Sequence, residues 1–518
     1  MSVPCRRSQA PYVLALDIGS TASRGGLYDA LGRPVKGSKQ RIPHHFDTNA
    51  HGRSTIDADA VVDECRRIID GVLECIREHD LAPQLVGVAM DTFASSFLLV
   101  RRGEALTPCA TYADARCAAD VHALRGTIDE EAYHVRTGVR LHTSYHPARL
   151  RWAARTMPEE FAAADAVMTL GEYVYAKLAG VRGISTSMAA WSGILHAHTG
   201  ELDTAILDVL GVSPELFAPI CDPSEPLLPT KLPAEWSELE GLPWLPAIPD
   251  GWPSTVGPGA SDEDTVAVAA ATSGAVRVLL PHVPERIPGG LWCYRVSREQ
   301  CIVGGALNDV GRAVSWLRST IREIPEEEIA AALLAPPRPA TPHVLPFLSG
   351  ERSTGWAADA QAAITGVTEA CGPADLWRGM VEGIVLSYRR VWEELRAAGA
   401  RPRRIIASGR VTSEMPAWLQ PLASALGCEV TPLEMKRATL RGTALIALDA
   451  LGHCATPATP PWAEAIAPRT EEQEYWDRAA EEFQRSYDAL VAPASTASQP
   501  AAPSASPAAS SPGAPEPR

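Results

Sequence analysis

Two segments, one near the N-terminus and one in the second half of the chain, share a pattern that constrains the fold more than any other feature. Residues 13–29 have the sequence VLALDIGSTASRGGLYD, which is an apolar strand, a polar Gly-Ser-Thr turn and a second strand. Residues 265–280, TVAVAAATSGAVRVLL, place a Thr-Ser-Gly turn between two strands in the same way. Backbone N–H groups and small hydroxyls in such turns bind phosphate. The sequence therefore predicts a duplicated, two-domain nucleotide enzyme.

Length and periodicity agree with this prediction. A chain of 518 residues is too long for one hydrophobic core. Alternating strand and helix patterns indicate an α/β architecture. Helical spacing of apolar residues is clearest over 57–78 and 373–398. We also expect helices over 113–124 (with Asp114 as the N-cap), 147–155, 171–178, 438–451 and 471–490, and buried strands over 84–90 and 404–407.

Charge and cysteine content exclude several classes of protein. The net charge of −15 argues against a general binder of nucleic acids or membrane surfaces, because both require a positive field. No apolar run has the length of a transmembrane helix. The 11 cysteines contain no CxxC pair or zinc-type spacing, which indicates reduced thiols. We therefore expect a cytoplasmic protein.

Composition also divides the chain. Residues 1–10 lack an apolar signal region and are expected to form a flexible arm. Two domains follow, over 11–252 and 253–491, with proline-rich irregular structure near their junction. Residues 492–518 are mostly Pro, Ala and Ser, and such a tail buries too little apolar surface to fold.

Acidic residues beside the turns are the first candidates for chemistry. Asp17 ends a strand next to Gly19, Ser20 and Thr21, where its carboxylate is placed to hold a metal ion. No GxxxxGK[ST] pattern occurs, so a Walker-type phosphate site is unsupported. Asp250, in the sequence Ile-Pro-Asp-Gly, is either a plain turn residue or a carboxylate that faces the cleft between the domains.

Two segments combine aromatic, acidic and basic side chains. They are TYADAR at 111–116 and TGVRLHTSYHPARLRW at 137–152. One interpretation is a helix start with a surface of salt bridges, and the other is a site for a polyol, whose hydroxyls bind carboxylates, arginine and an aromatic wall. The Gly-Glu-Arg sequence at 350–352 is expected to form a structural ion pair in either case.

The order of these segments resembles the FGGY family of carbohydrate kinases over nearly the whole chain. Within the family, the stretch 137–195 is most similar to the gluconokinase-like branch. The matching motifs are DIGSTASR at 17–24, TYADARCA at 111–118, TGVRLHTSYHPARLRW at 137–152, PDG at 249–251, ATSGAVR at 271–277, GGALNDVGRAVSWL at 304–317, PFLSGERS at 346–353, SGRVTSEMPAWLQPLASALG at 408–427 and RGTALIAL at 441–448.

The resemblance implies two actin-like (ribonuclease H-like) ATPase domains that close over ATP and a sugar. It implies that Asp250 is the catalytic general base and that Asp17 lies near Mg²⁺. The nucleotide-binding residues it implies are Gly19, Ser20, Thr21, Thr272, Ser273, Gly311 and Gly409. The substrate-binding residues it implies are Ser95, Tyr112, Asp114 and Tyr145, together with Asp250.

These matches also lead to an expected function. We expect an ATP-dependent kinase for a small sugar, sugar acid or polyol, with a homodimer as the candidate oligomeric state. Arg116, Arg140 and Arg149 favour a gluconate-like acid, because arginine binds a carboxylate through two parallel charge-assisted hydrogen bonds. The alternative for these arginines is that they cover helix surfaces.

Other functions stay open. A kinase for xylulose, ribulose or glycerol is one alternative. A non-catalytic, ATP-binding pseudokinase is another, because Ala271, Arg410 and Ser424 depart from the family pattern in the nucleotide region. A chaperone-type ATPase is disfavoured, since it gives Asp250 and the polyol-type cluster no purpose.

Overall fold

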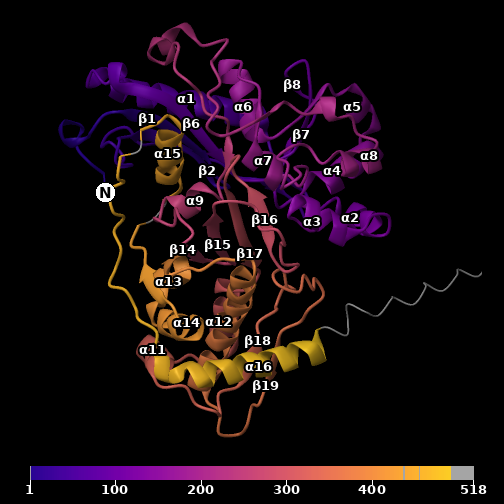
Figure 1. The fold of residues 1–518 in the computed structure, drawn as a ribbon, viewed down its shortest axis with the longest axis vertical. Coiled ribbons are helices and arrows are strands. Elements are labelled where there is room, and N and C mark those ends of the chain that lie inside the picture. Colours follow the sequence, from indigo (N-terminus) through magenta and orange to yellow (C-terminus); the bar gives the residue numbers. More distant parts are fainter. Residues whose placement is uncertain (1, 436–437, 454, 492–518) are drawn as a thin grey trace, which may run out of the picture.

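Two β-sheets, one in each half of the chain, organise the molecule into an upper and a lower body (Figure 1). The computed structural model describes residues 2–435, 438–453 and 455–491. The strands of the first sheet, in spatial order, are β13 (Ile248–Pro249), β6 (Leu85–Thr92), β1 (Tyr12–Ile18), β2 (Ala22–Tyr28) and β3 (Gln40–Pro43). Those of the second are β21 (Glu429–Pro432), β20 (Arg404–Ser408), β14 (Thr265–Ala270), β15 (Gly274–Leu280), β17 (Cys301–Leu307) and β16 (Trp292–Arg295).

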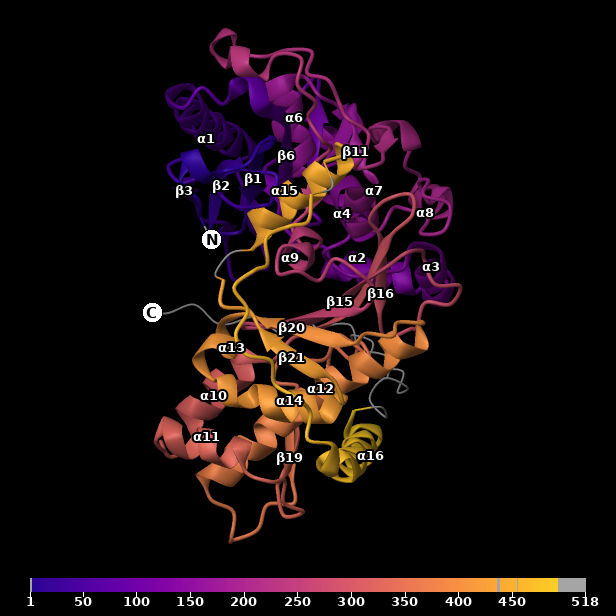
Figure 2. The ribbon, with the colours of Figure 1, turned by 60° about the vertical axis from the view of Figure 1, so that its left-hand side comes forward.

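The duplication predicted from the two turns is confirmed by the order and direction of these strands. In each sheet an antiparallel hairpin, β1–β2 or β14–β15, occupies the centre. A later strand, β6 or β20, pairs in parallel with the first strand of the hairpin. One further parallel strand, β13 or β21, then lies beside it. Figure 2 shows β1 and β2 in one body and β20 and β21 in the other.

Long amphipathic helices cover the sheets. Helix α1 (Ala58–Glu78) begins at Asp57, whose side chain accepts two backbone N–H groups as an N-cap. Its apolar face is buried against the first sheet. Helix α12 (Pro373–Ala397) begins after Gly372, whose N–H donates to the carboxylate of Asp375, and its apolar face joins the core of the second sheet.

The remaining expected elements are found close to their predicted positions. They are α4 (His146–Thr156), α6 (Leu170–Ala179), α15 (Thr439–Ala450) and α16 (Gln473–Leu490), together with strands β6 and β20. Helices that the sequence did not predict are α3 (Glu130–Thr137), α5 (Pro158–Ala163), α7 (Thr186–Trp191), α8 (Thr204–Leu210), α9 (Pro253–Val256), α10 (Gly311–Thr320), α11 (Glu326–Leu334), α13 (Arg410–Glu414) and α14 (Leu419–Leu426).

One predicted helix start is wrong. Helix α2 (Ala118–Arg125) begins five residues later than expected, and Asp114 does not cap it. The carboxylate of Asp114 instead accepts the backbone N–H of Ser54 and the guanidinium of Arg116. Both oxygens of Asp114 are engaged by these partners, and the contacts hold the turn that precedes α2.

The expectation of a loose N-terminal arm is also wrong for its first part. Val3 is buried and forms backbone hydrogen bonds to Pro34 and Lys36. A short 3-10 helix (Cys5–Arg7) follows it. These contacts attach the N-terminal residues to the first domain. The predicted tail at 492–518 lies outside the described residues.

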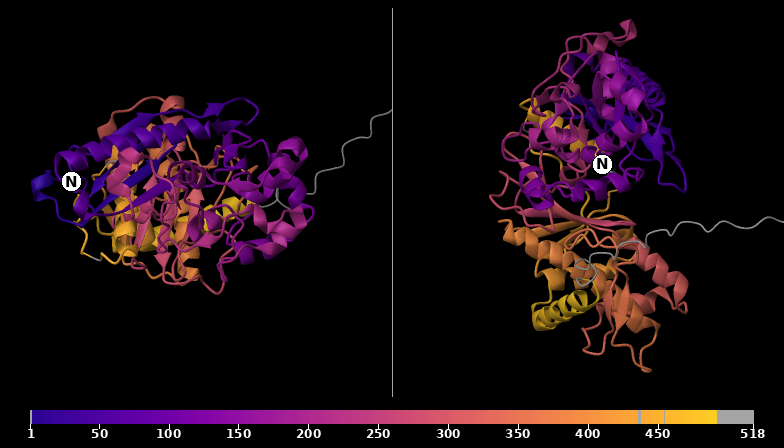
Figure 3. Two further views of the ribbon diagram at one scale, coloured as in Figure 1. Left: turned by 90° about the horizontal axis from the view of Figure 1, so that it is seen from above. Right: turned by 90° about the vertical axis from the view of Figure 1, so that its right-hand side faces the viewer.

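Helix α15 crosses the division expected at residues 252–253. It follows the second sheet in sequence, yet Ala444, Ala447 and Leu448 pack against β1 and β6 of the first sheet. Figure 1 and Figure 3 show this orange-yellow helix within the indigo and magenta body. The C-terminal half therefore contributes one helix to the N-terminal domain.

Two further findings concern membrane-spanning helices and the cysteines. Within the part of the chain that the structure describes, no helix combines the length and apolar character needed to span a membrane. The described cysteines are free thiols, which agrees with the expectation of reduced cysteines, and most of them are buried.

Candidate active site

Three carboxyl groups meet where parallel strands of the first sheet end. Asp17 in β1 lies directly opposite Asp91 in β6. Asp250 follows β13, on the other side of β6, and its backbone N–H donates to the carbonyl of Thr92. The predicted turn at Asp250 therefore also directs its carboxylate toward the junction between the two domains.

The proximity of these acids shifts their pKa values. Burial, followed by the charge of Asp17, raises the pKa of Asp250 to about 6, while Arg277 opposes this shift. Burial and Asp17 raise the pKa of Asp91 well above its usual range. The hydroxyl of Thr443 in α15 donates to Asp91. The sequence analysis did not single out Asp91.

Arg24 is a second residue that the sequence analysis missed. Its guanidinium lies 2.9 Å from the carboxylate of Asp17. The signal was available in the sequence, because a tight turn in the β1–β2 hairpin puts these two residues directly opposite each other. Asp17 therefore lies beside a cation, at the start of the first phosphate-type turn.

The acids fit a magnesium ion that takes most of its ligands from water and phosphate. Burial and then the charge of Asp17 raise the pKa of Asp250, and a divalent cation beside the two carboxylates would oppose both effects. Among the described residues no group of three or more His, Cys, Asp or Glu side chains is spaced to hold a metal alone. Mg²⁺ characteristically binds through one or two carboxylates and the substrate phosphates.

The first turn is held by hydrogen bonds at its edges. Gly19 donates its N–H to the carbonyl of Ala22, and its own carbonyl contacts Nε2 of His44 at 2.8 Å. Ser20 hydrogen-bonds to Tyr112, and Thr21 is exposed. The turn therefore presents small hydroxyls at the junction, as predicted.

The second turn lies between two helix starts. Thr272 and Ser273 are exposed. Gly311 begins α10, and a Cβ atom there would lie 2.4 Å from the carbonyl oxygen of Ala271. Gly409 precedes α13 with φ +103°, and a Cβ atom would lie 2.3 Å from the carbonyl oxygen of Ala270. Both positions require glycine because the end of β14 passes so close to them.

The departures from the family pattern have local explanations. Ala271 does not have a positive φ, so the turn requires no glycine there. Arg410 is exposed and lies 3.8 Å from Glu414 in the next turn of α13. Ser424 is buried and accepts the backbone N–H of Arg469. Each of these residues is accommodated in the fold of the second domain.

The predicted sugar-binding residues do not all present free groups. Tyr112 is 43% exposed and packs edge-on to Phe93. Asp114 is fully occupied by Arg116 and Ser54, as described above. Ser95 is buried and donates its hydroxyl to the carbonyl of Trp191 at 2.6 Å. Ser95 and Asp114 are therefore both held by hydrogen bonds to other protein groups.

An aromatic wall joins the two domains beside Asp250. Tyr145 is buried, and its hydroxyl lies 2.6 Å from that of Tyr294 in β16. The Tyr294 ring stacks on Trp191 in α7 at 3.8 Å between centroids and on Trp292 at 4.7 Å. Only Tyr145 was predicted, because the other rings come from segments far apart in the sequence.

The three arginines expected near the pocket are all engaged elsewhere. Arg116 pairs with Asp114 and covers the ring of Trp152. Arg140 contacts Glu131 and the carbonyl of Gly289. Arg149 is buried and donates to three backbone carbonyl groups. None of the three offers the free guanidinium that was the reason for expecting an acidic substrate.

The prediction of an ion pair within Gly350-Glu351-Arg352 is wrong. Glu351 pairs with Arg390 and accepts the hydroxyl of Tyr487. Arg352 has no ion-pair or hydrogen-bond partner for its side chain among the described residues.

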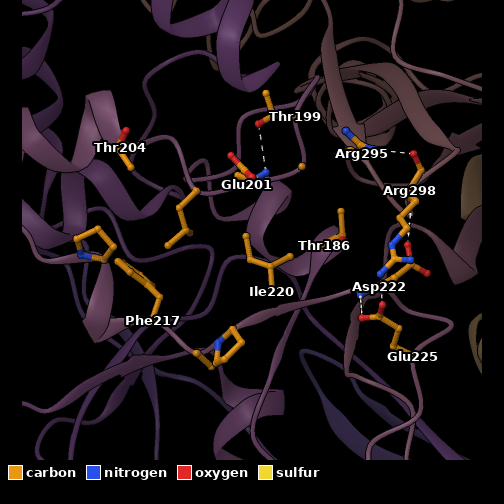
Figure 4. A pocket seen from close by; sticks show the side chains of 15 residues that line it. Thr186, Thr199, Glu201, Thr204, Phe217, Ile220, Asp222, Glu225, Arg295 and Arg298 are labelled. Atoms are coloured by element: carbon orange, nitrogen blue, oxygen red, sulfur yellow. Dashed lines mark hydrogen bonds and ion pairs between the residues drawn. The ribbon is translucent and has the colours of Figure 1, made fainter.

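A separate cavity of about 720 Å³ lies away from the three acids (Figure 4). Its arginines are occupied: Arg295 donates to carbonyl groups, including that of His198, and Arg298 pairs with Glu225. None of the predicted site residues lines it. The cavity therefore stands apart from the candidate active site.

Comparison with known proteins gives a consistent result over most of the chain. Residues 12–243 match the N-terminal domain of the FGGY family of carbohydrate kinases, and residues 270–451 match its C-terminal domain. A gluconokinase of Bacillus licheniformis is 24% identical over 85% of this chain and 88% of its own length. A glycerol kinase of Rhodospirillum centenum is 24% identical over 85% and 89%.

The fold is shared with a solved structure. The crystal structure of gluconate kinase from Lactobacillus acidophilus superposes with a TM-score of 0.82 at 24% identity, covering 92% of this chain and 98% of that one. The two matched domains follow each other in the order of the family, and together they cover most of the chain. The chain belongs to the FGGY family of carbohydrate kinases, which transfer a phosphoryl group from ATP to a sugar hydroxyl.

Proposed function

We propose that this kinase phosphorylates a hydroxyl group of a gluconate-like sugar acid, with Mg²⁺ accompanying ATP. The observation that carries the chemistry is the position of Asp250, a carboxylate directly after β13 that interacts with Asp17 and with Arg277 of the second domain and whose pKa is raised to about 6. A general base is most effective when its pKa lies near the working pH. The similarity to gluconokinases supports the choice of substrate.

In the proposed mechanism Asp250 accepts the proton of the attacking hydroxyl as the hydroxyl oxygen bonds to the γ-phosphorus. The bond between the γ-phosphorus and the β–γ bridging oxygen breaks, and ADP leaves with that oxygen. The turns at Ser20–Thr21 and Thr272–Ser273 position the phosphates with hydroxyl and N–H groups. Asp17 would hold Mg²⁺, and the bound ion would supply positive charge against the phosphate oxygens. Phosphoryl transfer depends mostly on positioning and electrostatics, and a site between two domains provides both.

A kinase for a ketose or polyol is the second candidate, because a glycerol kinase is similar to the chain to the same extent. A pseudokinase is less consistent with the residues present, since Asp17 and Asp250 are both retained. Homodimer formation and a cytoplasmic location stay predictions.

Substrate choice is tested by comparing kcat/KM for gluconate with that for xylulose, ribulose and glycerol. We expect gluconate to exceed each neutral compound by at least about tenfold, the size of one charge-assisted hydrogen bond. Coupled measurement of ADP release gives the rates. A neutral sugar that exceeds gluconate tenfold contradicts the acid assignment, while leaving the kinase assignment intact.

The pKa of Asp250 also predicts the pH dependence. The base acts in its ionised form, so kcat/KM should be constant above about pH 7 and should fall about tenfold per pH unit well below pH 6. The measurement is the pH profile of kcat/KM for the preferred sugar at saturating ATP. A flat profile from pH 5 to pH 8 would exclude Asp250 as the titrating base.

A further inference from the structure

The guanidinium groups of two arginines at the junction, Arg277 and Arg352, form no hydrogen bond or ion pair with the described residues. In each, Nε is buried without a hydrogen bond, and no described carboxylate forms an ion pair with either. A guanidinium has five N–H donors, and leaving buried donors unpaired costs free energy. This sets the pair apart from Arg140 and Arg149, which are engaged by protein atoms.

The backbone brings the two side chains together. Arg277 in β15 lies opposite Gly304 in β17. Two residues further along β17, Ala306 exchanges hydrogen bonds of 3.0 Å with the backbone N–H and the hydroxyl of Ser353, the residue after Arg352. Burial lowers the pKa of Arg277, and the charge of Arg352 lowers it further. Two like charges therefore lie near each other beside the second phosphate-type turn.

Their surroundings are those of the candidate sugar pocket. The Arg277 guanidinium lies 5.9 Å from the ring centroid of Trp292 in the aromatic wall, and its charge acts on Asp250. Arg352 acts electrostatically on Tyr145 and on His142. Burial and then Arg352 lower the pKa of His142 to about 3, so this imidazole is neutral and adds no positive charge.

We infer that Arg277 and Arg352 together bind the carboxylate of the substrate, an inference that rests on the proposed kinase function. A pair of partly buried guanidiniums with free donors matches an anion that accepts several parallel hydrogen bonds. The acid group of the sugar lies at the arginines and the reacting hydroxyl lies at Asp250. The wall of Trp191, Tyr294 and Trp292 then covers an apolar face of the sugar between them.

The rival role for the same cations is contact with the γ-phosphoryl group. The two roles differ in a measurable way. A carboxylate contact affects only acidic substrates, whereas a phosphoryl contact affects every acceptor equally, because the same group is transferred to each.

The test uses Arg352→Gln and Arg277→Gln in the full chain, with gluconate and D-glucitol as acceptors. D-Glucitol has a CH₂OH group where gluconate has its carboxylate. For each variant we expect kcat/KM for gluconate to fall about 10- to 100-fold, the range of hydrogen bonds to a charged group. For Arg352→Gln we expect kcat/KM for glucitol and KM for ATP to change less than about threefold. Arg277→Gln also removes the charge that opposes the raised pKa of Asp250, so for this variant the loss for gluconate is measured relative to the loss for glucitol.

Two further variants control for charge and folding. Arg403→Gln removes the same charge from a residue whose side chain is 81% exposed, and it should leave the gluconate preference unchanged. Arg352→Lys keeps the charge but loses the planar fork, and we expect an intermediate loss for gluconate. Thermal unfolding of every variant identifies any that has not folded. If Arg352→Gln does not fold, the comparison of gluconate with glucitol is made with Arg352→Lys.

Calorimetric titration with gluconate separates this inference from the proposed function. If the wild-type protein binds gluconate and Arg352→Gln binds it at least tenfold more weakly, the inference holds even where turnover is absent. Equal losses of kcat/KM for gluconate and glucitol would assign the arginines to the phosphoryl group and overturn it. Unchanged gluconate affinity in both glutamine variants would overturn it as well.

Discussion

Asp250→Asn is expected to lower kcat by a factor of about 10² to 10⁴, the usual contribution of a general base. Asparagine has nearly the same shape as aspartate but cannot accept the proton of the attacking hydroxyl. The affinity for ATP should be retained, because Asp250 follows a strand of the first sheet and lies outside both phosphate-type turns. Steady-state kinetics and nucleotide titration measure the two quantities separately.

A matched control for this variant is Asp208→Asn, which removes one exposed carboxylate from α8. It should retain wild-type kcat. If Asp250→Asn turned over at a rate near that of this control, Asp250 would be only the turn residue that its local sequence suggests.

Asp17→Ala is expected to have the second-largest effect and to act on the magnesium-dependent step. Without the carboxylate, the Mg²⁺ concentration for half-maximal rate should rise at least about tenfold, since Mg²⁺ has few protein ligands in such sites. The partner of Asp17, Arg24, would also be left beside the phosphates without its counter-charge. Initial rates over a magnesium titration at fixed ATP give the result.

Arg24→Gln is the natural comparison, because it breaks the same ion pair and keeps the acid. It should shift the magnesium curve far less than Asp17→Ala. Rates of Asp17→Ala that superpose on those of the wild type at every magnesium concentration would make Asp17 a structural residue of the hairpin.

The sequence predicted those parts of the fold that are encoded locally. The β1–β2 and β14–β15 hairpins each combine two apolar strands with a polar turn, so their repeat indicated two related sheets. Helices α1 and α12 carry long apolar faces at helical spacing. Position in the chain also pointed to Asp17, near the end of β1, and to Asp250, directly after β13.

The remainder depended on contacts between distant segments. Helix α15 joins the first domain through packing against β1 and β6, which its own amphipathic pattern does not specify. Glu351 precedes Arg352 in sequence but pairs with Arg390, so the charge pattern alone named the wrong ion pair. For the same reason, Arg116 and Arg149 were expected in the pocket although Asp114 and backbone carbonyl groups engage them.

The most direct test of the central claim is to identify both products after incubation of the enzyme with ATP, Mg²⁺ and gluconate. Phosphorus NMR distinguishes a sugar phosphate ester from inorganic phosphate, and a coupled assay counts ADP. The mechanism at Asp250 predicts one ester per ADP, with both products lost together in Asp250→Asn. ADP accompanied by inorganic phosphate alone, or no ADP with gluconate or any sugar of the panel, would contradict it.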